Sequence, residues 1–299
     1  MNKLIVILGP TAIGKTAFSI ELAKHFQTEI LSCDSRQFFK EMNIGVARPD
    51  ISELAAAPHH FIGHISIVDD YSAGRFEQEG LLLLEELFKN HNHVLLTGGS
   101  GLYLDALLKG FDDLPSSIDV RQSLIALHHE MGLQPLLEEL IQFDPEYFHM
   151  VDRDNPHRII RALEVCRVSG QKYSELRKGK EKSRAFDVVK IGLTSDREWL
   201  YNRINQRVDQ MISNGLLEEV KSLWDYRHLN ALNTVGYKEI FDTIEGKHSF
   251  DQAIDKIKQH TRNYAKRQLT WWRREEDIHW IRIDQSTNPI AEALEIIKN

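Results

Sequence analysis

The sequence predicts a doubly wound α/β fold, in which helices cover both faces of a parallel sheet, with a helical insertion. Short apolar runs that end in turn residues alternate with helical patterns, and this alternation is typical of parallel α/β sheets. One long stretch breaks the alternation and shows helical periodicity only. We therefore place the core with its C-terminal helices in 1–115 and 187–299, and the insertion in 116–186. The expected strands cover residues 4–9, 29–35, 93–100, 188–195 and 278–284.

The first strand leads directly into a phosphate-binding signature. The octet GPTAIGKT stands between the apolar run LIVIL and the helical pattern TAFSIELAKHF, which is the strand–loop–helix context of a P-loop. Such a loop aims backbone N–H groups into one concavity, and the helix N-terminus adds positive partial charge. We expect a P-loop NTPase-like core whose loop binds a di- or triphosphate, with a Lys cation and a Thr hydroxyl for Mg²⁺. The predicted diphosphate-binding residues are Gly9, Pro10, Thr11, Ala12, Ile13, Gly14, Lys15 and Thr16.

Two further strand ends carry candidate site residues, because ligands of open α/β sheets lie beyond the carboxyl ends of the strands. Asp34 follows the second strand and can act as a general base or help to hold Mg²⁺, with helix capping as the alternative. The third strand ends in TGGS, without the acidic residue of an ATP-hydrolysing motor. Ser100 can point its hydroxyl at a ligand, although tight-turn chemistry explains this motif equally well.

Two arginines share one face of the helical pattern over 196–215. Arg203 and Arg207 are four residues apart, and arginines beside a P-loop can stabilise charge on a departing phosphate. A solvated face is the alternative, and we favour it for Arg203.

The segment 258–274 combines cations with aromatic rings and contains no Asp or Glu. Cations suit phosphates and rings suit unstacked bases, so the pattern fits a nucleic-acid strand. We favour partner contact for the cations and core packing for Trp271 and Trp272. The cations are Arg262, Lys266, Arg267, Arg273 and Arg274.

Charge and composition restrict the possible partners and location. The net charge is −7, so any nucleic-acid surface must be local. The two cysteines suggest neither a disulfide framework nor a metal site. No apolar run reaches the roughly 18 residues of a membrane span, and no signal peptide is recognised. We expect a cytoplasmic protein without a membrane partner.

The order and spacing of the motifs resemble the tRNA dimethylallyltransferases, also called tRNA isopentenyltransferases, over nearly the whole chain. Four positions depart from the family pattern: Arg48 stands where Lys is usual, Ser100 where Thr is, and His157 and Asn263 where Gln is common. Besides the P-loop, the resemblance rests on DSRQFFKEMNIGVARPD (34–50), PHHFIGHI and YSAGRFEQE (within 58–79), LTGGSGLYLDALLKG (96–110), HRIIRALEV (157–165), NTVGYKE (233–239) and TRNYAKRQLTWWRR (261–274).

This resemblance implies transfer of a dimethylallyl group from dimethylallyl diphosphate to the exocyclic amine of the adenosine 3′-adjacent to the anticodon. Lys15, Thr16 with Mg²⁺, and Arg207 would neutralise the departing diphosphate. Asp34 would accept the amine proton, and Ser100 would form a hydrogen bond near the base or the bridging oxygen. The target base would leave its stack to reach the site.

The same resemblance implies contacts with the tRNA anticodon stem-loop, which the insertion would grip. We expect the enzyme to act as a monomer. The residues expected to contact tRNA are Asp34, Ser35, Arg36, Gln37, Ser100, Arg121, His157, Arg158, Ile159, Ile160 and Arg161.

Three other functions fit parts of the pattern. A P-loop small-molecule kinase shares the loop, the Asp and the glycine turn, but lacks the insertion and this C-terminal half. An adenylate isopentenyltransferase shares the chemistry but uses a free nucleotide. A non-catalytic RNA-binding switch is the third, and intact Lys15, Thr16 and Asp34 argue against it.

Overall fold

The computed structural model describes residues 2–179 and 181–298 and divides into two compact units. One unit comprises the chain up to Leu108 and from Arg184 onward, and the other comprises Lys109–Ser183. The first unit contains the sheet and the candidate site. Each unit has a hydrophobic core of its own.

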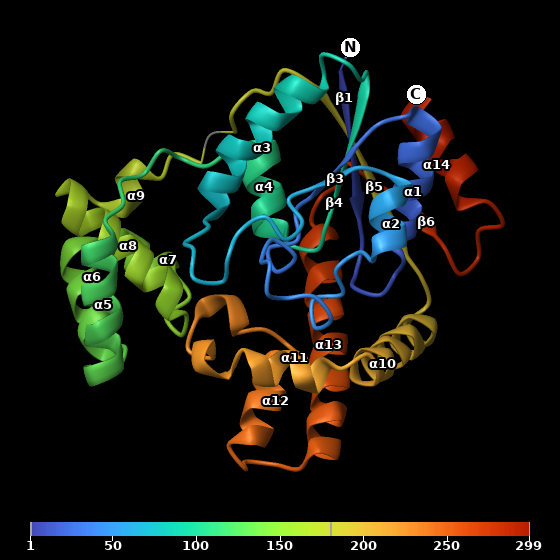
Figure 1. Ribbon diagram of the computed structural model, residues 1–299. Helices are drawn as coiled ribbons and strands as arrows, with labels where there is room; N and C mark the ends of the chain where they lie inside the picture. The colour runs from blue at the N-terminus through green and yellow to red at the C-terminus, as the bar shows by residue number, and fades with distance from the viewer. Residues whose placement is uncertain (1, 180, 299) are drawn as a thin grey trace. The chain divides into compact units, whose positions relative to one another are not determined.

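The sheet of the first unit has six strands among the described residues, all parallel, in the order β3-β2-β4-β1-β5-β6 (Figure 1). The predicted parallel α/β sheet is confirmed. The short edge strand β3 was not predicted, because two residues carry no periodicity. The bounds are β1 Lys3–Leu8, β2 Ile30–Ser32, β3 His59–His60, β4 His93–Thr97, β5 Asp187–Thr194 and β6 Ile278–Arg282.

Helices cover both faces of this sheet, which explains why the central strands β1, β2 and β4 are mostly apolar and buried. Along β1, Leu4 and Val6 face one core and Ile5 and Ile7 face the other. The helices of this unit are α1 Lys15–Phe26, α2 Ile51–Ala56, α3 Ala73–Leu87, α4 Gly101–Lys109, α10 Arg197–Ser213, α11 Leu216–Ser222, α12 Tyr237–Ile244, α13 Phe250–Trp272 and α14 Pro289–Lys298, with 3₁₀ turns at Trp224–Tyr226 and Asn230–Leu232.

Helix α13 is longer than the basic segment predicted from 258 onward. It begins at Phe250 because Ser249 and Gln252 form a capping box. Its buried face carries Ala253, Ile257, Ala265, Gln268 and Trp272. The helix runs past the carboxyl ends of the strands, where it forms one wall of the site (Figure 1).

The second unit is entirely helical in its described residues. Its core contains leucines of three helices together with Tyr147 and Ile159. The Asp144 side chain caps one helix by accepting the Tyr147 N–H, and it also accepts the N–H and hydroxyl of Ser174. The helices are α5 Ile118–Met131, α6 Gln134–Phe143, α7 Pro145–Met150, α8 Pro156–Ser169 and α9 Tyr173–Leu176.

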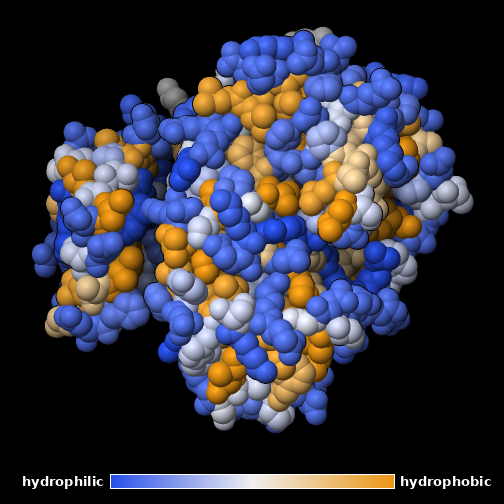
Figure 2. Space-filling model, viewed as in Figure 1, coloured by the Kyte–Doolittle hydropathy of each residue, from blue (hydrophilic) through white to orange (hydrophobic). Residues whose placement is uncertain are grey.

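On the face shown in Figure 2, polar side chains surround separate groups of apolar ones. Among the helices of the described chain, none has the length and apolar character needed to cross a bilayer.

Candidate active site

The P-loop adopts a conformation that gathers N–H groups at the start of α1. Gly9, Ala12 and Gly14 all have positive φ, at 144°, 64° and 108°. The Lys15 ammonium folds back and donates to the carbonyl oxygens of Gly9 at 2.8 Å and Pro10 at 3.0 Å. These bonds hold the cation over the loop, where a phosphate can reach it.

The charge on Lys15 is sensitive to its surroundings. The pKa of Lys15 is lowered from 10.5 to about 8, mainly by burial; the Asp34 carboxylate opposes this decrease and the nearby Arg207 cation adds to it. Burial likewise lowers the pKa of the Arg207 guanidinium, which keeps its charge. Two cations and one carboxylate therefore surround the loop, which favours an added anion.

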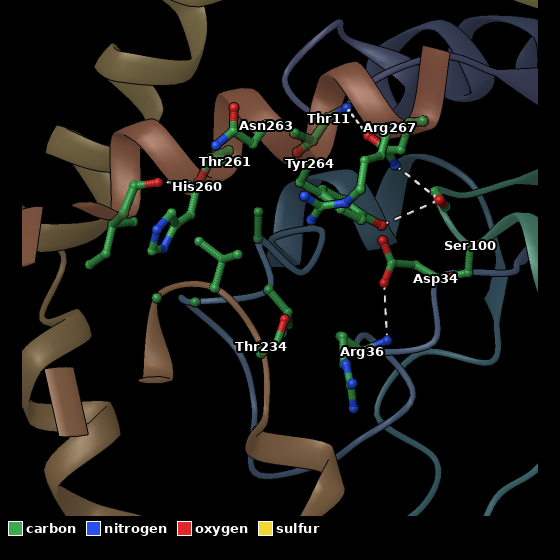
Figure 3. Close-up of a pocket in the computed structure, with 18 of the residues that line it drawn as sticks. Thr11, Asp34, Arg36, Ser100, Thr234, His260, Thr261, Asn263, Tyr264 and Arg267 are labelled. Atoms are coloured by element: carbon green, nitrogen blue, oxygen red, sulfur yellow. Dashed lines mark hydrogen bonds between the residues drawn. The ribbon is translucent and has the colours of Figure 1, made fainter. Parts of the chain in front are cut away.

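A cavity of about 1000 Å³ opens beside the P-loop at the carboxyl ends of the strands (Figure 3). This volume is at the upper end of ordinary ligand pockets, so it can hold a nucleotide-sized group as well as a small apolar chain. Its walls come from Thr11 of the loop, residues 34–36 after β2, residues 99–103 after β4, the segment 45–47, α10, residues 233–239 and α13.

Asp34 and Ser100 meet at the cavity wall as expected from their strand ends. The Asp34 carboxylate accepts the Arg36 N–H at 3.0 Å, which leaves its other oxygen toward the cavity (Figure 3). The Ser100 hydroxyl accepts the Ser35 N–H at 3.0 Å and donates to the Ser35 hydroxyl at 2.9 Å. Ser100 thus joins the turns after β2 and β4, and its hydroxyl is occupied by this role.

Gln268 of α13 is a site residue that the sequence analysis missed. Its amide oxygen accepts the Thr11 N–H at 2.8 Å, and its amide nitrogen donates to the Gly99 carbonyl at 2.9 Å. A Cβ on Gly99 would lie 2.5 Å from that nitrogen, so only glycine permits the approach. Gln268 therefore joins the P-loop to the β4 turn. The signal available in the sequence was its helical spacing from Ala265 and Trp272, which places a polar side chain on the apolar face of the helix.

Arg36 and Gln37 have structural partners. The Arg36 guanidinium donates to the carbonyl oxygens of Asn230 at 2.9 Å and Ala231 at 3.0 Å, and Gln37 donates to those of Val46 and Ala47. These bonds attach neighbouring loops to the end of β2. Arg36 lines the cavity, whereas Gln37 is not among the lining residues.

The two arginines of α10 both face the P-loop region. Arg207 lines the cavity, as expected. Arg203 donates from Nε to the Ala12 carbonyl at 2.9 Å and lies over the Trp199 ring. Arg203 is exposed, as the solvated-face interpretation expects, but its Nε–H also has a specific partner in the P-loop.

The adjacent tryptophans of α13 point to different environments. Trp272 is 2% exposed and belongs to the core, as predicted, whereas Trp271 is 39% exposed and lines the cavity. The prediction for Trp271 was wrong because successive helix residues point about 100° apart. Tyr264 also lines the cavity and donates to the Gly99 carbonyl at 3.3 Å.

A model of one protein family, described as IPP transferase, matches residues 37–275. The chain belongs to this family. It is 51% identical to the tRNA dimethylallyltransferase of Christiangramia forsetii over 98% of both chains. It is 48% identical to tRNA dimethylallyltransferase 1 of Bacteroides thetaiotaomicron, over 96% of this chain and 94% of that one. The resemblance drawn from the motifs is confirmed.

Solved structures agree with the assignment to the IPP transferase family. The full-length tRNA isopentenylpyrophosphate transferase of Bacillus halodurans matches with a TM-score of 0.74 and 35% identity, over 100% of this chain and 96% of that one. A eukaryotic dimethylallyltransferase solved acting on tRNA matches with a TM-score of 0.82 and 26% identity, over 99% of this chain and 78% of that one.

The turn 43–45 and Tyr237 belong to two motifs that are far apart in the sequence, and both contact the carboxylate of Glu219. Glu219 accepts the N–H groups of Asn43, Ile44 and Gly45 at 2.7–3.2 Å, and the Tyr237 hydroxyl at 2.5 Å. Burial and Glu219 raise the pKa of the Tyr237 phenol, so it stays a donor. Glu219 thereby fixes the 43–45 turn beside the cavity, a role that the sequence analysis missed.

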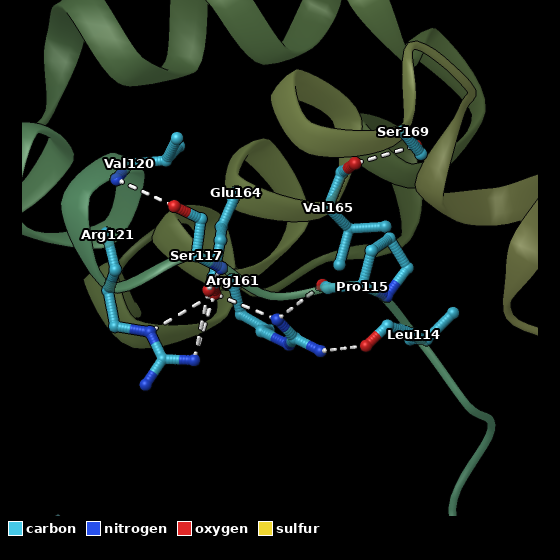
Figure 4. Close-up of polar contacts among 9 residues, drawn as sticks. All are labelled: Leu114, Pro115, Ser117, Val120, Arg121, Arg161, Glu164, Val165 and Ser169. Carbon is cyan, nitrogen blue, oxygen red and sulfur yellow. Dashed lines mark hydrogen bonds and ion pairs between the residues drawn. The ribbon is translucent and has the colours of Figure 1, made fainter.

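In the helical unit, two arginines donate to one buried carboxylate. Glu164 is fully buried and accepts hydrogen bonds from Arg121, Arg161 and the Ser117 N–H at 2.8–3.1 Å (Figure 4). Arg161 also donates to the carbonyl oxygens of Leu114 and Pro115. Both arginines remain about one-third exposed, at 37% and 33%.

The 157–161 stretch divides by exposure. His157 and Arg158 are exposed at the start of α8, while Ile159 and Ile160 are buried among the apolar residues of the helical unit. The expectation that these two isoleucine side chains contact RNA is therefore wrong. The helical period turns them inward, and they hold α8 in place.

Proposed function

We propose that this chain transfers a dimethylallyl group from dimethylallyl diphosphate to the exocyclic amine of the adenosine 3′-adjacent to the anticodon of a tRNA. The observation that carries the proposal is the continuity of a P-loop, a carboxylate and a nucleotide-sized cavity at one edge of the sheet. The names of the relatives, tRNA dimethylallyltransferases, support the same activity.

In this mechanism the amine nitrogen attacks the allylic carbon and the carbon–oxygen bond to the diphosphate breaks. The diphosphate leaves with that electron pair and stays on the P-loop N–H groups, Lys15 and Arg207, which stabilise its charge. The nitrogen loses its proton to the free oxygen of Asp34. No phosphoryl group moves, so ATP hydrolysis is not needed.

The loop also fits Mg²⁺. Thr16 offers a hydroxyl at the start of α1, and Mg²⁺ commonly takes few protein ligands while substrate phosphates and water complete its octahedron. Thr16 would hold the ion, with Asp34 nearby. Bound there, Mg²⁺ would add positive charge beside the leaving diphosphate.

The proposal extends to the helical unit as the part that binds the anticodon stem-loop. Arg121, His157, Arg158 and Arg161 present exposed or partly exposed nitrogen donors, which suit phosphate oxygens. On the other unit we assign tRNA contact to Asp34, Ser35 and Arg36 of the cavity wall, with Gln37 and Ser100 positioning them. We also propose that the enzyme acts as a monomer.

Incubation of the purified protein with labelled dimethylallyl diphosphate, Mg²⁺ and an anticodon stem-loop, without ATP, tests the function. We expect label in the RNA at the adenosine beside the anticodon. A parallel reaction contains AMP in place of the RNA as the acceptor. Labelling of AMP alone would support a free-nucleotide prenyltransferase, and no transfer to either acceptor would reject the proposal.

A further inference from the structure

The segment 230–236, between α11 and α12, forms part of the cavity wall. Its residues 233–236 line the cavity, and Figure 3 shows Thr234 there together with Arg36 and His260. After one 3₁₀ turn the backbone of the segment is irregular up to the start of α12. Its position therefore depends on hydrogen bonds to other elements rather than on a helix or strand of its own.

The first end of the segment is attached to the turn that carries Asp34. The Arg36 guanidinium donates to the carbonyl oxygens of Asn230 at 2.9 Å and Ala231 at 3.0 Å. The backbone N–H of the same Arg36 donates to the Asp34 carboxylate at 3.0 Å. One residue thus holds both the segment and the proposed proton acceptor, so a shift of the segment is passed to the turn at Asp34.

The second end of the segment is attached to α13 through one buried carboxylate. Glu239 is 4% exposed, and its Oε2 accepts the Gly236 N–H at 2.7 Å. Its Oε1 lies 2.5 Å from Nδ1 of His260, and because a carboxylate only accepts, the imidazole donates. Glu239 therefore joins the last residue of the segment to the middle of the long helix.

His260 is the side chain on which the alignment of Glu239 depends. A buried carboxylate is costly unless its oxygens accept hydrogen bonds. Lys238 and Lys256 also line the cavity, but among the described residues neither forms an ion pair with Glu239, and Asp242 is paired with Lys247. The His260 side chain is itself 47% exposed, so it can be replaced without opening the core.

We infer that Glu239 and His260 are positioning residues for the prenyl transfer. They hold the second end of the segment 230–236 against α13, and the segment in turn keeps Arg36 and the turn at Asp34 in place. Neither side chain contacts the reacting atoms in the proposed mechanism. The inference rests on the proposed function and adds to it the pair that aligns the cavity wall.

Two substitutions at one position test the pair. His260→Ala removes the donor to Glu239, whereas His260→Asn places an amide nitrogen where Nδ1 stands and keeps the bond. Single-turnover transfer of labelled dimethylallyl to an anticodon stem-loop is measured with both substrates saturating. We expect His260→Ala to lower this rate on the order of tenfold, because small displacements of reacting groups reduce rates strongly. We expect His260→Asn to recover most of the loss.

Gln259→Ala is the matched control, since Gln259 is the exposed neighbour on the same helix and does not line the cavity. Its transfer rate should equal that of the wild type. We expect the KM for dimethylallyl diphosphate to stay near the wild-type value in all variants, because the P-loop is untouched. The urea midpoint of His260→Ala should match that of Gln259→Ala.

The outcomes separate the positioning role from the proposed function. An unchanged rate in His260→Ala overturns the inference, and so does an equal loss with Ala and Asn, because the hydrogen bond is then not the cause. A rate loss that follows a lowered urea midpoint assigns the effect to folding and also overturns it. A wild-type protein that transfers no prenyl group to RNA rejects the function itself.

Discussion

Cations around the P-loop and cations at the buried carboxylate of the helical unit have different main partners. In the α/β unit, Lys15, Arg36 and Arg203 donate to backbone carbonyl oxygens. In the helical unit, Arg121 and Arg161 share the buried carboxylate of Glu164. A neutral carbonyl positions a cation and leaves its charge uncancelled. A carboxylate also positions the cation but carries a negative charge, so Glu164 neutralises one of the two arginine charges beside it.

This difference separates a site for an anionic ligand from a structural connection. Around the P-loop the net positive charge remains available to a diphosphate. In the helical unit the same residue type fixes the segment 114–117 against α8, and only its remaining N–H groups can reach phosphates. The following predictions test this division, from the largest expected effect to the smallest.

Asp34→Asn should reduce the chemical step by about 10²–10⁴-fold, because it removes the proton acceptor while keeping an oxygen for the Arg36 N–H. Single-turnover transfer to the stem-loop measures this step, and anisotropy should show nearly unchanged RNA affinity. Asp242→Asn is the control, since Asp242 lines the same cavity but is paired with Lys247. Equal rate losses in both variants would remove the special role of Asp34.

Glu164→Gln should lower the free energy of unfolding of the helical unit by about 2–3 kcal/mol. Breaking a fully buried pair costs more, but both arginines here are partly exposed to water. Urea unfolding monitored by circular dichroism measures the change. Glu175→Gln breaks the exposed pair with Lys172 and should cost less than about 0.5 kcal/mol. Comparable losses would show that Glu164 is not structural.

Gln268→Met should destabilise the α/β unit by about 1–3 kcal/mol, because it leaves the Thr11 N–H and the Gly99 carbonyl without their partner. We also expect a higher KM for dimethylallyl diphosphate, since the P-loop loses its connection to the β4 turn. Gln252→Met on the same helix disturbs only an exposed cap. An unchanged KM in Gln268→Met would show that the P-loop holds its shape unaided.

Diphosphate affinity should fall as the pH rises through about 8, the pKa of Lys15. Because this pKa lies below the ordinary 10.5, the charge is present below pH 8 and lost above it. The decrease attributable to Lys15 should approach tenfold per pH unit. Calorimetry with pyrophosphate from pH 7 to 9.5 measures it against Lys15→Arg, whose charge does not titrate. Parallel profiles in the two proteins would contradict the shifted pKa.

The P-loop and the parallel sheet could be predicted because their signals are local. The octet 9–16 contains the glycines, the Lys and the helix start within one turn of chain, and each apolar strand is marked by its own composition. Asp34 and Ser100 followed from one topological rule about strand ends. The hydrogen bond from Arg203 to the Ala12 carbonyl could not be predicted in this way, since it joins residues 191 positions apart in the sequence.

By itself, the sequence determined a doubly wound α/β core, a phosphate-binding loop and a resemblance to tRNA dimethylallyltransferases, all read from short-range patterns. Tertiary structure alone decided that Gln268 would join a loop 257 residues away, that Glu219 would fix the 43–45 turn, and that Trp271 would stay exposed against Gly101. These contacts depend on how α11 and α13 pack across the strand ends. Such packing is set by the shape of whole surfaces, which no local pattern of residues encodes.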